Sequence, residues 1–80
     1  MKWSLRFSPE AVAALRRVER SFVGNVWVVL NALEEDHTSV PFQSTEDDPS
    51  IYWAAAPGDY TVWFEILDEE HAIRVLDIED

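Results

Sequence analysis

The chain of 80 residues has a formal net charge of −10, is 48% hydrophobic and contains no cysteine. This length predicts a single domain over residues 1–80, and the apolar content excludes an intrinsically disordered chain. The lack of cysteine excludes disulfides and thiolate chemistry and suits a cytoplasmic protein. The lack of a long apolar run predicts that the chain has no membrane segment or signal peptide.

Charge is distributed unevenly along the sequence. Residues 1–20 hold five basic and two acidic residues, a net charge of +3, whereas residues 21–80 hold one basic and fourteen acidic residues, a net charge of −13. We expect the acidic surface to repel nucleic acid and to attract a basic partner. The alternative is that the acidic residues only keep a small protein soluble.

The N-terminal segment alternates polar and apolar residues from Lys2 to Phe7, which predicts a half-buried strand. Ser8 and Pro9 then form a helix start, with serine as the N-cap and proline at the first helical position. We expect a first helix from about Pro9 to about Ser21. The apolar side chains that should face the sheet from this helix are Val12, Leu15, Val18 and Phe22.

A second helix is predicted after a break at Gly24 and Asn25, and it should run from about Asn25 to Asp36. Its three valines lower the helix propensity, so a strand is the alternative interpretation. The length of the segment and its ending Asn-Ala-Leu-Glu-Glu-Asp favour the helix.

The segment from His37 to Pro49 reads as a long loop, and loops of this length often bind a ligand or move. Val40 and Phe42 are expected to hold its middle against the core. The acidic run 46–48 lacks the fixed spacing of a calcium loop. We therefore predict no metal site and no cofactor.

The most informative stretch is the turn Pro57–Asp59 followed by the apolar run Tyr60–Leu67. Proline, glycine and aspartate are turn residues, and a run that is apolar on both sides is typical of a central strand. The flanking segments 50–56 and 72–80 also read as strands. Short turns join all three, which predicts an antiparallel meander.

The two faces of the central strand have different side chains. One face carries Tyr60, Val62, Phe64 and Ile66. The other carries Thr61, Trp63, Glu65 and Leu67. Both faces are largely apolar, so the pattern leaves open which of them the helices cover.

The predicted element order is therefore β-α-α-β-β-β. We expect an α+β domain in which an α-helical hairpin packs on one face of an antiparallel sheet. The N-terminal strand should pair with one of the three later strands.

These segments resemble the RelE/ParE family of toxins from type II toxin–antitoxin systems. Trp3–Ala11 is similar to the first strand and helix start of that family, and Leu15 fits its following helix. Gly58–Tyr60 is similar to its glycine-aspartate-tyrosine strand, and Ile73–Ile78 to its last strand. The resemblance implies a toxin component that binds a cognate antitoxin and acts on translation, through ribosome-dependent mRNA cleavage, or on DNA gyrase.

The sequence departs from the family at its basic positions. Thr61 stands where the family usually has arginine, and Ala54 and Ala56 stand at strand positions that are often arginine. The last strand ends in acidic residues, Glu79 and Asp80, where the family continues into a basic or histidine-containing tail. Most of the basic active-site residues are thus missing, which predicts a weakened or repurposed toxin and leaves enzymatic activity open.

Three residues remain as candidates for catalysis: Arg6, Glu65 and Arg74. Cleavage of RNA needs cations to stabilise charge on the phosphate and a base to activate the ribose hydroxyl. The alternative for Arg74 is an ion pair with Glu65 on the neighbouring strand. His71 lies in a predicted hairpin turn, where we expect a solvated side chain.

Four apolar residues are candidates for partner binding: Trp53, Trp63, Leu67 and Leu76. A sheet face left uncovered by helices needs a partner segment or a second copy to cover it. The alternative function is therefore a non-enzymatic acidic interaction module, or a homodimer, that binds a basic partner. Ribosome or mRNA is expected as a partner only if the toxin is active.

Overall fold

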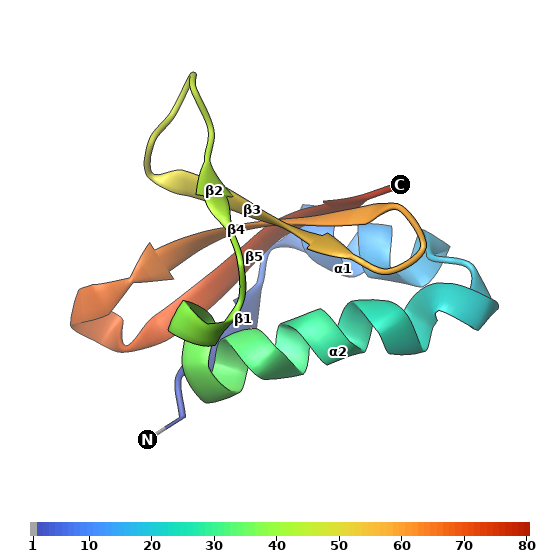
Figure 1. Cartoon of the computed structure of the whole chain (residues 1–80), viewed down its shortest axis with the longest axis horizontal. Coiled ribbons are helices and arrows are strands. Elements are labelled where there is room, and N and C mark those ends of the chain that lie inside the picture. The colour runs from blue at the N-terminus through green and yellow to red at the C-terminus, as the bar shows by residue number, and fades with distance from the viewer. Residues whose placement is uncertain (1) are drawn as a thin grey trace.

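The computed structural model describes residues 2–80, so Met1 of the predicted domain lies outside the described residues. These residues form a five-stranded sheet and two helices (Figure 1). The strands are β1 (Ser4–Phe7), β2 (Gln43–Ser44), β3 (Ile51–Ala56), β4 (Tyr60–Leu67) and β5 (Ala72–Glu79). The helices are α1 (Pro9–Arg17) and α2 (Arg20–Asp36), and two short 3₁₀ turns are η1 (His37–Ser39) and η2 (Asp68–Glu70).

The strands are arranged in the order β1-β5-β4-β3-β2, so β4 is central as predicted. The pairs β3–β4 and β4–β5 are antiparallel and form the predicted meander. The expectation of a wholly antiparallel sheet is wrong, because β1 pairs with β5 in parallel. Alternation of apolar residues identifies a strand but carries no information on the direction in which it meets a distant partner.

Both helices lie on one side of the sheet, and the other side carries no helix (Figure 1). Val62 and Phe64 of β4 are fully buried beneath the helices, whereas Trp63 and Glu65 on the opposite side are partly exposed. The structure thereby settles which face the helices cover. Among residues 2–80, no helix has the length and apolarity needed to cross a membrane.

The boundary between the helices differs from the prediction. The chain leaves the helical conformation at Val18 and Glu19, whose backbone is extended, and α2 then continues through Gly24 to Asp36. The Tyr60 hydroxyl oxygen accepts a hydrogen bond from the Glu19 backbone N–H at 3.3 Å, which ties this turn to the sheet. Glycine in a helix costs about 1 kcal/mol, and burial along a helix of 17 residues outweighs that cost.

The face that α1 turns toward the sheet also differs from the prediction. Ala11 and Ala14 are buried there, whereas Val12, which was expected to face the sheet, is 37% exposed. Val18 is buried, as expected. Small alanine side chains let the helix approach β5 closely, and a count of large apolar residues does not detect a face of this kind.

The predicted loop 37–49 is partly ordered into η1 and β2. Gln43 pairs with Trp53, so this segment forms the outermost strand of the sheet beside β3. Val40 is buried and Phe42 packs against the core, as expected. Two residues are too few to produce an alternating pattern, which is why the sequence does not reveal β2.

Candidate functional site

We call the helix-free side of the sheet the outer face. On β4 it carries the side chains of Thr61, Trp63, Glu65 and Leu67. The register extends it to the neighbouring strands, where Glu65 pairs with Arg74 and Trp63 pairs with Trp53. The helices lie on the opposite side alone, so no helix covers this face (Figure 1).

The three catalytic candidates lie next to one another on the outer face. Arg6 of β1 pairs with Arg74 of β5, and Arg74 pairs with Glu65 of β4, so the three side chains form one row across the sheet. Arg74 donates a hydrogen bond to Glu65 at 3.1 Å, which is the ion pair that the alternative reading expected. Arg6 forms a second ion pair with Glu70.

Both arginines of this row are therefore matched by a carboxylate. The Arg74 side chain is 47% exposed and the Glu65 side chain 24% exposed. Ion pairs exposed to this extent contribute little to stability, about 0–1 kcal/mol. A ligand phosphate that approached the row could therefore compete with Glu70 and Glu65 for the two arginines, because the existing ion pairs are weak.

Beside this row lies a pair of tryptophans. Trp53 and Trp63 face each other on adjacent strands, with ring centroids 6.5 Å apart. The Trp63 Nε1 atom is buried and has no hydrogen-bond partner among the described residues. Trp53 also lines a shallow hollow of about 340 Å³ at the β2 edge, together with Pro41, Phe42, Gln43 and Ala55.

The other two partner-binding candidates lie away from the tryptophan pair. Leu76 stands at a bulge in β5, because Trp63 pairs with Asp77 whereas the next residue of β4 pairs with Val75. Leu67 lies at the far end of β4 and lines a second hollow, of about 370 Å³, with the acidic residues of η2. All four candidates are partly buried, so each retains some surface on or beside the outer face.

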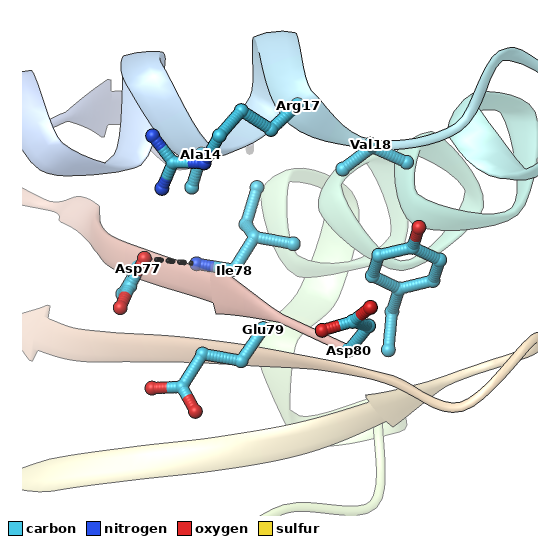
Figure 2. Close-up of a pocket in the computed structure, with 8 residues that line it drawn as sticks. Ala14, Arg17, Val18, Asp77, Ile78, Glu79 and Asp80 are labelled. Atoms are coloured by element: carbon cyan, nitrogen blue, oxygen red, sulfur yellow. Dashed lines mark hydrogen bonds between the residues drawn. The ribbon is translucent and has the colours of Figure 1, made fainter.

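A third hollow was not predicted, and it lies where α1 passes the end of β5 (Figure 2). Its volume is about 380 Å³, and we call it the acidic hollow. Arg17 reaches toward it from α1, and three carboxylates, those of Asp77, Glu79 and Asp80, extend from the end of β5 (Figure 2). The sequence signal that could have indicated this hollow is the run Asp77-Ile78-Glu79-Asp80, which ends the last strand with three acidic residues.

His71, the remaining candidate from the sequence, packs against aromatic side chains. His71 is not solvated as expected: its ring stacks on Trp3 at 4.1 Å, and its Nε2 atom is buried. His37 contacts the same tryptophan edge-on at 4.5 Å. The exposed residues Arg16 and Arg20 form no ion pair within the described part of the chain.

The whole chain is similar to solved toxin structures. It matches a chain of the toxin–antitoxin complex RelBE2 of Mycobacterium tuberculosis with a TM-score of 0.85 and 17% identity, covering 99% of this chain and 98% of that chain. It matches a chain of the intact RelBE complex of E. coli with a TM-score of 0.79 and 15% identity, covering 98% and 95%. A chain of the chromosomal ParDE system of P. aeruginosa gives a TM-score of 0.76 and 14% identity, covering 98% and 95%.

No protein-family model matches the sequence, and no curated protein is similar to it. Structural likeness at such low identity defines the fold. The chain therefore has the RelE/ParE-like toxin fold, and the predicted α+β architecture with helices on one face of the sheet is confirmed.

Proposed function

We propose that the chain is the toxin component of a type II toxin–antitoxin system and that a cognate antitoxin binds it. The observation that carries this proposal is the likeness to chains of solved toxin–antitoxin complexes. The likeness extends over nearly the full length of this chain and of each matched chain. The outer face, which no helix covers (Figure 1), supports it. Partly exposed tryptophans on an uncovered sheet are typical of a binding surface.

As its cellular action we propose inhibition of translation through cleavage of mRNA, at a low rate. Arg6 and Arg74 would stabilise charge on the scissile phosphate, and Glu65 would act as the base, since these three lie in one row. The low rate follows from two features. Each arginine already has a carboxylate partner, and the net charge of −10 opposes the approach of RNA.

A second candidate function is a non-enzymatic interaction module. The specific observation in its favour is that the outer face carries Thr61 between Ala55 and Glu79 on the adjacent strands, at the place where the family usually has arginine. A toxin that has lost its chemistry would retain the same uncovered face. Such a module would bind a protein partner without cutting RNA.

Induced expression in a bacterial host tests the proposal, with growth and incorporation of labelled amino acids followed over time. We expect slowed growth and reduced protein synthesis from the wild type, relief by Arg74→Ala, and no relief by Arg16→Ala. The second variant removes the same charge from an exposed position on α1. Both variants should fold, because exposed charged side chains contribute little to stability.

Two results would decide between the candidates. Unaffected growth at good soluble yield of the wild type contradicts the toxin proposal and leaves the interaction module. Growth inhibition that Arg74→Ala does not relieve but Trp53→Ala does would show inhibition by binding without cleavage. A small adjacent reading frame whose product restores growth would support the antitoxin partner.

A further inference from the structure

The outer face combines an apolar centre with carboxylates at two of its ends. Trp53 and Trp63 form the centre and are partly exposed. At the η2 end, Leu67 shares a hollow with Asp68, Glu69 and Glu70. At the opposite end of β5, Asp77 and Glu79 stand opposite Trp63 and Thr61 on this face. With Asp80 they also line the acidic hollow, which lies at the adjoining edge of the sheet, between the end of β5 and α1 (Figure 2).

Few cations on this face remain to balance these carboxylates. Arg6 is paired with Glu70, and Arg74 is paired with Glu65. Within residues 2–80, the acidic residues at the end of β5 form no ion pair, and Arg17 is the one cation that lines the acidic hollow. The face thus offers more negative charge than its own residues neutralise.

This charge pattern decides which partner the face fits. A second copy of the chain would bring another net charge of −10 against the same carboxylates, and RNA would bring a charge on every phosphate. Repulsion opposes both approaches, and for RNA it is the same repulsion that limits the proposed cleavage to a low rate. A protein segment with lysine or arginine beside apolar side chains matches the charge and the apolar centre together.

We propose that the segment that covers the outer face is basic and apolar. Its aromatic or aliphatic side chains pack on Trp53 and Trp63, and its lysine or arginine side chains enter the acidic hollow. The inference rests on the proposed function in that this segment is taken to be part of the antitoxin. The excess of carboxylates disfavours an acidic antitoxin segment on this face.

The geometry of the acidic hollow suits a long cationic side chain. One oxygen of the Asp77 carboxylate accepts a hydrogen bond from the Ile78 backbone N–H at 2.8 Å, and the other oxygen has no partner within residues 2–80 (Figure 2). Tyr60 and Ala14 supply apolar walls along which a lysine or arginine stem can lie. Its charged head would then reach the carboxylates of β5.

Two synthetic peptides serve as the probe, with the same tryptophan and leucine positions and with either lysine or glutamate at all other positions. Each is titrated into the full chain labelled with ¹⁵N at low salt, and the indole N–H signals are followed by NMR. The chain carries four tryptophans. Trp53 and Trp63 report on the outer face, whereas Trp27, in α2, packs against Phe7 and serves as an internal control.

We expect the lysine peptide to shift the indole signals of Trp53 and Trp63 but not that of Trp27, and the glutamate peptide to shift none. Asp77→Asn combined with Glu79→Gln should weaken binding of the lysine peptide by roughly tenfold, since it removes two of the three carboxylates. Glu34→Gln combined with Glu35→Gln makes the same change of net charge at the end of α2. This matched control should change the affinity less than about twofold.

Equal affinity for the two peptides would overturn the proposal, and so would a shift of the Trp27 signal as large as those of Trp53 and Trp63. Equal weakening by the two paired variants would also overturn it, because net charge alone would then explain binding. The expression experiment reads toxicity and does not depend on these peptides. Failure of the basic partner and failure of the toxin function are therefore distinguishable.

Discussion

The two faces of β4 belong to the same eight residues, yet they have different roles. On the helix side, Val62 and Phe64 have no exposed surface. On the outer side, Trp63 and Leu67 keep part of theirs, and Glu65 forms an ion pair. Apolar content alone does not separate these faces, because each carries a large aromatic side chain.

The difference between the faces lies in what covers them. The helix side is closed by α1 and α2, so Val62 and Phe64 contribute their full burial to folding. The outer side is left to solvent and carries the charged row and the tryptophan pair, and the acidic hollow lies at its edge, between β5 and α1. One face of the strand supports the fold, and the other is available for a partner.

Removal of a side chain from the covered face should have the largest effect. Phe64→Ala should lower the free energy of unfolding by about 3–5 kcal/mol, because it leaves a cavity at the centre of the core. Thr61→Ala on the outer face of the same strand should change it by less than about 0.5 kcal/mol. Urea unfolding of both variants checks this, and equal losses would contradict the assignment of the two faces.

The turn before β4 should be sensitive for a steric reason. Gly58 has φ of +89°, and an added Cβ would lie 2.5 Å from Cδ1 of Phe22. Gly58→Ala should therefore destabilise the fold by about 1–3 kcal/mol. Gly24→Ala is the control, because no atom lies within 4 Å of its added Cβ. Because Gly24 lies inside α2, Gly24→Ala should stabilise the fold by about 0.5–1 kcal/mol. Thermal unfolding should therefore show a lower Tm for Gly58→Ala and a higher Tm for Gly24→Ala.

Salt should stabilise the isolated chain. The molecule measures 34 × 30 × 24 Å, so at low salt its acidic residues repel one another across most of its width. The Debye length falls from about 30 Å at 0.01 M to about 3 Å at 1 M salt. We expect a rise in stability of no more than about 1 kcal/mol, because each exposed charge interacts weakly.

The variant Asp77→Asn with Glu79→Gln sharpens that measurement. It removes two negative charges from the edge of the outer face, so the rise of Tm with salt should be smaller than in the wild type. A fall of Tm with added sodium chloride would contradict the claim that repulsion among the acidic residues destabilises the chain. It would show instead that salt acts on stability mainly by weakening the exposed ion pairs.

The smallest expected effect is a dependence on acidic pH. The Ser50 hydroxyl and backbone N–H both donate to the Asp48 carboxylate and hold its pKa below the usual value, and Thr38 does the same for the pKa of Asp36. A carboxyl group whose pKa is lowered in the folded state stabilises the fold above its unfolded pKa, and this contribution is lost as the pH falls through the folded value.

The contribution of these two carboxyl groups to stability should therefore be lost below roughly pH 4. Asp48→Asn removes one of the two contributions, so its stability should change less over that range than the wild type. Both carboxyl groups are fully exposed to solvent, and the difference should be small. Unfolding in urea at several pH values checks it, and an unchanged pH profile in Asp48→Asn would contradict the role of the Ser50 hydrogen bonds.

Local sequence patterns predicted most of the elements. The Ser8 cap is confirmed by a hydrogen bond that its hydroxyl oxygen accepts from the Ala11 N–H, and the central strand and its two neighbours are confirmed as well. The ion pair of Arg74 with Glu65 was also predicted. In a short hairpin, the residue that lies opposite a given position can be found by counting residues from the turn. All these features depend on residues close in sequence.

The errors all involve contacts between distant segments. The break at Val18 depends on the contact with Tyr60, and β2 depends on pairing with β3. His71 was expected in solvent, but Trp3 from the other end of the chain covers it. None of these contacts leaves a periodic signal in the segment that makes it.

The sequence by itself determined four of the five strands, the existence of the two helices and the acidic charge, because propensity, capping and alternation act over a few residues. Only the tertiary structure decided that β1 lies parallel to β5, which aligns Arg6 with Arg74 and Glu65, and that the helices cover the side of Phe64 and leave Trp63 open. The physical reason is that both faces of β4 are apolar. The face that is covered is the one that packs with residues of both helices, Ala11 and Ala14 among them, and a single strand cannot encode that packing.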